Sequence, residues 1–246
     1  MNTMPVVNVF NEPYEIWEER EPTCQEMMNG FFGPQKTRII ETIYTHYQAA
    51  EYELLNRGCT KLDDHISRVL NNSSEFSKMR RMMPSITDKI LSDFQNSFQS
   101  TSFDKVSEIV DRDGKILSEG QILYHGGFYN GKVDETFVTT RPLSTSFSPH
   151  MACQNAEWRG KAYDVGALHL IILRVVTPQT NAFCFKINGT NKGHEKEVLF
   201  SKGAKLTLRA KHEIKKDGMV YKGCHINPGR VLEKTIPFYI LEIDIS

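Results

Sequence analysis

The chain has 246 residues, of which 39% are hydrophobic and 24% are charged, a composition ordinary for a globular protein that buries a core. Thirty basic and thirty acidic residues cancel, so the molecule as a whole offers no electrostatic footprint for nucleic acid or an acidic membrane. Five cysteines without a close-spaced pair argue against a disulfide framework and against a Cys-x-x-Cys metal site. They favour reduced thiols in a cytosolic setting.

The first residues lack a basic segment followed by an apolar core, so we expect no secretory signal peptide. The longest apolar stretch, 166–176, is interrupted by His169 and Arg174 and is too short to span a bilayer. We therefore expect a cytoplasmic protein with no membrane partner. If the protein is delivered into another cell, the cytoplasm is that of the target or host cell. The sequence leaves the oligomeric state open.

The beginning of the chain has helical periodicity. Apolar residues of the segment 34–58 fall on one stripe, which predicts a helix that ends at Gly58. A second helix is predicted over Lys61–Leu70, with Thr60 as its N-cap and Asp63 in the capping-box position.

A third helix is predicted after Pro84, because Ser85 and Asp88 precede another periodic run. Short polar segments join these helices. We therefore predict that residues 1–105 form a helical N-terminal region, and nothing in it resembles a catalytic constellation.

From residue 106 onward the apolar period becomes two, which is typical of strands. Four runs predict strands: 114–127, 166–176, 197–226 and 235–246. The second reads as a buried central strand. Turns are predicted at Lys202-Gly203 and Asp217-Gly218, and Pro237 indicates an edge or a strand start. We predict an α+β fold in which the helical region packs on a β-rich domain of residues 106–246.

Three short motifs in the second half carry polar residues suited to chemistry. They are Leu-Tyr-His-Gly-Gly at 123–127, Leu-Ser-Thr-Ser at 143–146 and Glu-Lys-Glu at 195–197. Residues two apart on a strand share a face, so Glu195 and Glu197 are expected to project side by side. Ser144 and Ser146 should likewise share a face, with Thr145 opposite. Two anions on one face repel, so they need either cationic neighbours or a substrate whose positive charge appears between them.

The order of these motifs resembles the ADP-ribosyltransferase superfamily, which cleaves NAD at the bond between nicotinamide and ribose and passes ADP-ribose to an acceptor. The resemblance covers roughly residues 115–246 and implies a split β-sandwich. Toxin-like members with Ser-Thr-Ser and Glu-x-Glu carry an arginine at the end of the first strand. This chain instead has His125 followed by Gly126, a pair that the poly-ADP-ribose polymerase branch uses.

The resemblance implies that NAD is a co-substrate and that Ser144 positions both the nicotinamide ribose and the catalytic glutamate. It implies further NAD-binding residues: His125, Gly126, Thr145, Ser146 and Phe147. Breaking the glycosidic bond of NAD builds an oxocarbenium-like cation, which a carboxylate stabilises most in the transition state, and we assign that role to Glu197. Glu195 is expected to face the acceptor, where it could take up its proton. No metal is expected.

Nicotinamide also needs an aromatic plate, and the sequence does not choose among Phe147, Phe137, Phe128 and Tyr129. The segment 183–194 is predicted to be a mobile loop that meets the acceptor.

Three functions stay open. The first is a mono-ADP-ribosyltransferase whose macromolecular acceptor is a protein side chain, arginine among the candidates, or a nucleic acid, favoured by the basic run at 205–222. The second is an NAD glycohydrolase, in which water is the acceptor. The third is a catalytically inactive module on the same fold that binds NAD or a partner.

Overall fold

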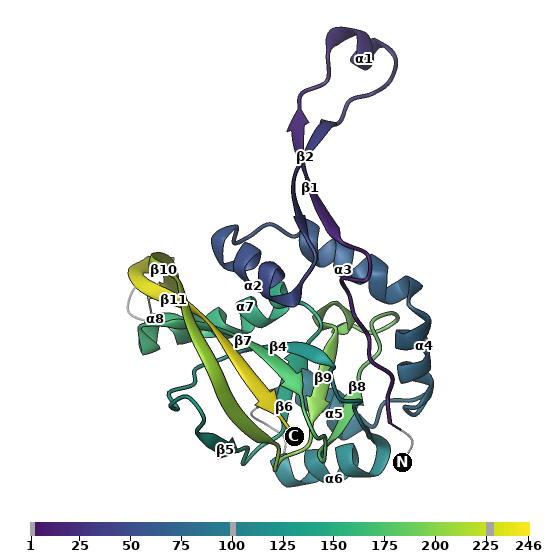
Figure 1. Ribbon diagram of the computed structural model, residues 1–246, viewed down its shortest axis with the longest axis vertical. Coiled ribbons are helices and arrows are strands. Elements are labelled where there is room, and N and C mark those ends of the chain that lie inside the picture. The colour runs from purple at the N-terminus through teal and green to yellow at the C-terminus, as the bar shows by residue number, and fades with distance from the viewer. Residues whose placement is uncertain (1–2, 99–101, 225–228) are drawn as a thin grey trace.

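A large mixed sheet forms the centre of the molecule (Figure 1). The structure is a computed structural model that describes residues 3–98, 102–224 and 229–246. Within these ranges the sheet has nine strands in the order β3-β8-β9-β6-β4-β7-β11-β10-β5. In chain order they are β3 (Lys115–Ile116), β4 (Ile122–Gly126), β5 (Thr136–Val138), β6 (Leu143–Ser146), β7 (Leu168–Val175), β8 (Asn181–Cys184), β9 (Glu197–Phe200), β10 (Lys205–Gly223) and β11 (Val231–Ile245).

The sheet is nearly divided in two between β4 and β6. Among the described residues, the one pair that joins these strands is Tyr124 with Ser146. By contrast, β4 pairs with β7 over five residues and β6 pairs with β9 over four. Neighbouring strands run antiparallel except β7 and β11, which are parallel. We call the place where β4 and β6 meet the junction.

Strand β7 is the buried central strand that the sequence predicts. All of its residues except Arg174 are buried. Alternate side chains enter two different cores, because Ile171 and Leu173 belong to the larger apolar cluster whereas Leu170 and Ile172 belong to the smaller one. The sheet is therefore covered on both faces.

Helices supply the covering layers. They are α1 (Cys24–Met28), α2 (His46–Leu55), α3 (Lys61–Asn72), α4 (Ser74–Arg81), α5 (Lys89–Asn96), α6 (Phe103–Asp113), α7 (Pro149–Glu157) and α8 (Lys161–Val165). Buried residues of α3, α4, α5 and α6 join the larger cluster, and those of α7 and α8 join the smaller one. Among the described residues, no helix combines the length and the apolar character that a membrane span would need. The predicted mixture of helices and a β-rich half is present as a mixed α/β molecule with one large sheet.

The beginning of the chain is not wholly helical, which corrects the sequence-based prediction. Strands β1 (Tyr14–Arg20) and β2 (Gln35–Ile43) pair antiparallel and carry α1 at their far end, as an arm that projects from the molecule (Figure 1). The helix predicted over 34–58 begins only at His46. Ile39 and Ile40 fall on the predicted helical stripe, but both are exposed on the arm. β-Branched residues fit a strand at least as well as a helix.

Thr45 marks the true start of that helix. Its hydroxyl accepts a hydrogen bond from the Gln48 backbone N–H, and the Gln48 side chain accepts one from the Thr45 N–H in return. This capping box satisfies two N–H groups that would otherwise lack partners at the helix end. The sequence therefore contained a start signal inside the segment that we read as one helix.

The other predicted helix starts have mixed outcomes. Helix α3 begins at Lys61 as predicted, but the Thr60 side chain makes no capping hydrogen bond and Asp63 bonds elsewhere. Helix α5 begins at Lys89, where the Asp88 side chain accepts from the Ile90 N–H at 2.9 Å.

Polar segments read as linkers also hold structure. Ser73 is the N-cap of α4, since its hydroxyl accepts from the Phe76 N–H at 3.1 Å. Helix α6 runs across the boundary predicted between residues 105 and 106.

The turn at Lys202-Gly203 is confirmed, whereas the one predicted at Asp217-Gly218 is wrong. Strand β10 continues through it with an irregularity between Lys215 and Gly218. A β-carbon at Gly218 would lie 2.2 Å from the Phe238 ring, so glycine here makes room for a packed side chain. Pro237 lies inside β11 opposite this irregularity, and β11 lies between β7 and β10, so the edge or strand start that Pro237 indicated is wrong. Residues 225 and 226 of the predicted strand lie outside the described residues.

Candidate active site

Ser144 and Glu197 are in direct contact across two neighbouring strands. Glu197 opens β9 and pairs in register with Ser146 of β6, so the side chains of Ser144 and Glu197 lie diagonally on one face of the sheet. The Ser144 hydroxyl donates to Glu197 Oε1 at 2.6 Å. Glu197 is 5% exposed, so this short bond forms in a desolvated setting.

His125 approaches the same pair from the other side of the junction. Its Nδ1–H donates to the Ser144 carbonyl oxygen at 2.7 Å. Burial lowers the pKa of His125, which keeps the imidazole neutral and leaves Nε2 as an acceptor. The structure thus brings together His125, Ser144 and Glu197 from β4, β6 and β9, which are adjacent in the sheet.

The Glu197 carboxyl titrates near neutrality. Burial raises its pKa to about 7, with the nearby charge of Glu195 acting in the same direction. The hydrogen bonds from Ser144 and Gln95 oppose this effect because they stabilise the ionised form. A buried carboxyl with such a pKa next to a hydroxyl and a histidine is typical of catalytic sites.

Gln95 is a site residue that the sequence analysis missed. It lies near the end of α5, and its amide donates to Glu197 Oε2 at 2.9 Å. Nothing local could have found it, because a single amide on an amphipathic helix is ordinary surface composition. The N-terminal region was predicted to hold no chemistry, yet it supplies a hydrogen bond to the candidate catalytic carboxylate.

Glu195 and Glu197 do not alternate along a strand, which corrects the predicted geometry. Glu195 ends the 3-10 helix η3 (Gly193–Glu195), and Lys196 adopts a left-handed conformation with φ 49° before β9 begins. The Ser146 hydroxyl donates to the Glu195 carbonyl at 2.7 Å and so helps to hold this turn. The Glu195 carboxylate pairs with Lys192 Nζ at 2.8 Å.

The side chain of Lys196 holds the turn that precedes β9 in place. Its side chain is 3% exposed, and Nζ donates to both carboxylate oxygens of Asp63 and to the His194 carbonyl, each at 2.9 Å. The Ser148 hydroxyl donates to the same carboxylate. Asp63 belongs to α3, so a helix of the N-terminal region fixes the turn ahead of Glu197.

The remaining residues predicted to bind NAD have partners within the protein. The Thr145 hydroxyl donates to the Val198 carbonyl at 2.6 Å. Phe147 is 1% exposed and packs edge-on against Phe76, with ring centroids 5.7 Å apart. A β-carbon at Gly126 would lie 1.6 Å from the Ala152 carbonyl oxygen, so this glycine lets α7 approach β4.

The aromatic residues near the motifs differ in how open they are. Phe128 is 55% exposed and stacks on His169, with ring centroids 5.1 Å apart. Phe137 is exposed on β5, and Tyr129 is half-buried. Phe147 is enclosed in the core. Among the predicted candidates, Phe128 and Phe137 are therefore the residues whose aromatic faces are open to a ligand.

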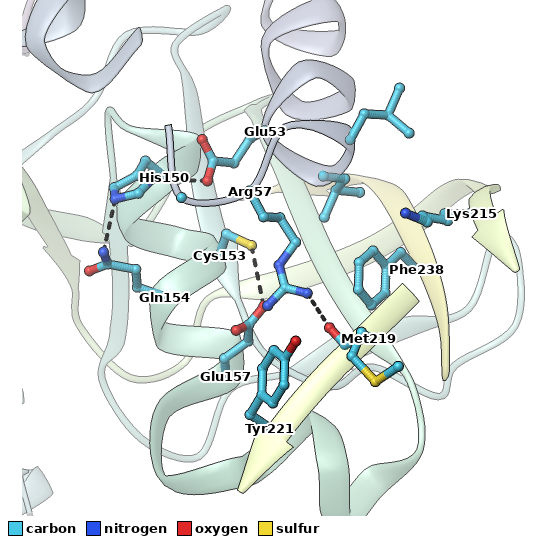
Figure 2. Close-up of a pocket in the computed structure, with 13 residues that line it drawn as sticks. Glu53, Arg57, His150, Cys153, Gln154, Glu157, Lys215, Met219, Tyr221 and Phe238 are labelled. Atoms are coloured by element: carbon cyan, nitrogen blue, oxygen red, sulfur yellow. Dashed lines mark hydrogen bonds and ion pairs between the residues drawn. The ribbon is translucent and has the colours of Figure 1, made fainter. Parts of the chain in front are cut away.

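A pocket of about 510 Å³ lies elsewhere, lined by residues around the end of α2, by α7 and by the β10 and β11 strands (Figure 2). It does not include His125, Ser144 or Glu197. Arg57 lies over the Phe238 ring at 5.0 Å and pairs with Glu157. His150 Nδ1 lies 2.9 Å from Glu53 Oε1. The polar groups of this pocket mostly pair with one another.

In the part of the chain that the structure describes, no group of three or more histidine, cysteine, aspartate or glutamate side chains is arranged to hold a metal.

Comparisons with known proteins find similar solved structures. No family model and no curated protein matches the chain. It is similar to Plx2a, an ADP-ribosyltransferase toxin from Paenibacillus larvae, with 12% identity, a TM-score of 0.46 and coverage of 75% of this chain and 96% of that one. It is also similar to the ADP-ribosyltransferase Vis from Vibrio splendidus in complex with the M6 inhibitor, with 12% identity, a TM-score of 0.45 and coverage of 79% and 90%. Because these sequence identities and TM-scores are low, the function has to be argued from the residues of the candidate site.

Proposed function

We propose that the protein is an NAD-dependent mono-ADP-ribosyltransferase. It would cleave the bond between nicotinamide and ribose and transfer ADP-ribose to a macromolecular acceptor, either a protein side chain such as arginine or a nucleic acid. The observation that carries the proposal is the contact between Ser144 and Glu197 beside His125. These residues are far apart in the chain, and their convergence supports the resemblance of the three motifs to the superfamily.

Glu197 would stabilise the positive charge that develops on the ribose as nicotinamide leaves. A carboxylate acts most strongly on such a charge when it is fixed in place and shielded from water, as Glu197 is. The Ser144 hydroxyl restricts its orientation by bonding one oxygen. The same physical logic explains the carboxylates of glycosidases, whose sugar cation is closely related.

His125 would bind NAD rather than transfer protons. Its Nδ1–H is committed to the Ser144 carbonyl, so Nε2 can accept a hydrogen bond from a ribose hydroxyl or the carboxamide. Gly127 keeps this nitrogen accessible, because a β-carbon there would lie 2.8 Å from Nε2.

Glu195 would act on the acceptor. In the transfer step the acceptor nucleophile forms a bond to the ribose carbon that nicotinamide has left, and its proton passes to a base. Glu195 ends the turn that leads directly into Glu197, and its charge acts to raise the Glu197 pKa, so its carboxylate is suited to that role.

Nicotinamide release from labelled NAD tests the proposal. We expect Glu197→Gln to abolish release, and Glu195→Gln to abolish transfer while some hydrolysis of NAD remains. Glu119→Gln, at an exposed glutamate ahead of β4, is the matched control and should behave like the wild type. A Glu197→Gln variant with full activity would end the assignment.

One observation favours NAD glycohydrolase as a second candidate. Glu195 already pairs with Lys192, so the carboxylate assigned to the acceptor is partly neutralised and water could take the place of a macromolecule. Incubating the protein with labelled NAD and a cell lysate separates the two functions. Label that remains on macromolecules supports transfer, and treatment with RNase or protease then identifies the class of acceptor.

A further inference from the structure

We propose that Gln95 is a positioning residue for Glu197, which holds the carboxylate in one orientation and stabilises its charge. The proposal rests on the proposed function, because it deepens the role of the same carboxylate. It also makes α5 of the N-terminal region part of the catalytic unit.

The carboxylate is held from two sides. Ser144 donates to Oε1 from β6, and Gln95 donates to Oε2 from α5. An ionised carboxylate has about four acceptor positions. Each oxygen therefore keeps a lone pair for the substrate, so the Gln95 contact orients the group without using up its capacity to bind.

The helix that carries Gln95, α5, is held in place by packing, by a cap and by an ion pair. Leu91 and Phe94 of α5 are buried in the larger apolar cluster, and the Asp88 side chain caps the first turn. Arg112 of α6 pairs with Asp88 at 3.1 Å and ties the two helices together. A site built on such an element is held more precisely than one built on a loop.

The Gln95 amide offsets part of the cost of burying the charge of Glu197. Burial disfavours the charged form of Glu197, and each hydrogen bond to the carboxylate opposes that effect. If the Gln95 amide is removed, Oε2 stays buried without the donor that offsets its desolvation. The carboxyl should then keep its proton to a higher pH, and the fraction available for catalysis at neutral pH should fall.

The pH dependence of nicotinamide release tests this role. In the wild type, kcat/KM should rise with pH through about 7. In Gln95→Met, which keeps the chain length but has no N–H, the rise should move up by about one pH unit, so that activity at pH 6 falls about tenfold and recovers at high pH. The control is Asn96→Leu, because Asn96 is an exposed amide on the same helix whose side chain bonds to the Ser92 carbonyl. It should not shift the profile.

A second readout does not depend on activity. Gln95→Met should lower the stability to urea more at pH 8.5 than at pH 5.5, since the lost bond matters most when Glu197 is ionised. In a Glu197→Gln background this difference between the two pH values should vanish. Gln95→Leu repeats the measurement if the methionine variant does not fold.

The two readouts separate the possible failures. An unshifted profile in Gln95→Met, or an equal loss of stability at both pH values, overturns the role of Gln95. A wild-type protein that releases no nicotinamide at any pH rejects the proposed function, while the unfolding measurements still decide whether Gln95 stabilises the carboxylate charge.

Discussion

Lys196 Nζ lies 2.9 Å from both carboxylate oxygens of Asp63, and the pair is largely enclosed. The two residues come from distant parts of the chain, and their contact ties α3 to the turn that orients Glu197. A buried charge that loses its partner keeps its desolvation cost without the compensating attraction. This ion pair should therefore matter more to stability than the exposed pairs of the same protein.

Asp63→Asn should lower the free energy of unfolding by about 3 kcal/mol, because it leaves the buried Lys196 ammonium without a counter-charge. Urea unfolding at neutral pH measures the loss. Lys61→Met, which removes an exposed pair with Glu19, is the control and should cost less than about 1 kcal/mol. Equal losses in the two variants would show that the enclosed pair has no special weight.

The ionisation of Glu197 should make the stability of the protein depend on pH. Its pKa is raised from an ordinary 4.5 to about 7 in the folded state, so folding favours the protonated form. That contribution to stability is fully present below about pH 4.5 and is lost as the pH rises through about 7.

Glu197→Gln cannot lose a proton. The variant should therefore gain stability relative to the wild type between pH 5 and pH 8, by at most about 3 kcal/mol. Urea titrations at the two pH values measure the gain. Ser144→Ala should move the window to higher pH, because it removes a hydrogen bond to the ionised form. A relative stability of Glu197→Gln that does not change with pH would contradict the raised pKa.

Gly126→Ala should destabilise the fold by about 1–3 kcal/mol, since the added carbon would overlap the Ala152 carbonyl of a packed helix. Thermal or urea unfolding detects the change. Gly33→Ala has no atom within 4 Å of the new carbon and should stay within about 0.5 kcal/mol of the wild type. If Gly126→Ala instead kept full stability, close packing could not be the reason for this glycine.

The two aromatic residues that follow the first two motifs should respond differently to truncation. Phe147→Ala leaves a cavity in the core and should cost about 3–5 kcal/mol. Phe128→Ala removes an exposed ring that stacks on His169 and should cost less than about 1.5 kcal/mol. Comparable losses would mean that Phe128 is as enclosed in solution as Phe147.

Sequence patterns predicted the strands that carry the site but not the groups that support it. The Ser-Thr-Ser run forms β6. The order of the three motifs led to the prediction that His125, Ser144 and Glu197 lie close together. Asp63 was expected only to cap its own helix, and Gln95 was not expected to have a role. Each is a single polar residue on an amphipathic helix, and only tertiary packing brings it to the site.

Backbone conformation explains the errors. A left-handed lysine at position 196 has no local signature, so alternation was wrongly extended through it. In the arm, Ile39, Ile40 and Ile43 fit a helical stripe as well as a strand, and short apolar runs cannot be resolved by period alone.

The junction between β4 and β6 is the place in the described sheet where neighbouring strands share the least backbone pairing. The pairing of Tyr124 with Ser146 is the single rung described there, and the larger apolar cluster contains residues of both groups, such as Leu123 and Leu199, so side-chain packing joins the two groups where backbone bonding is sparse. His125 stands on one group and Glu197 on the other. On the proposed function, NAD bound beside these two residues would contact both groups of strands, and it should slow amide hydrogen exchange in both groups at once.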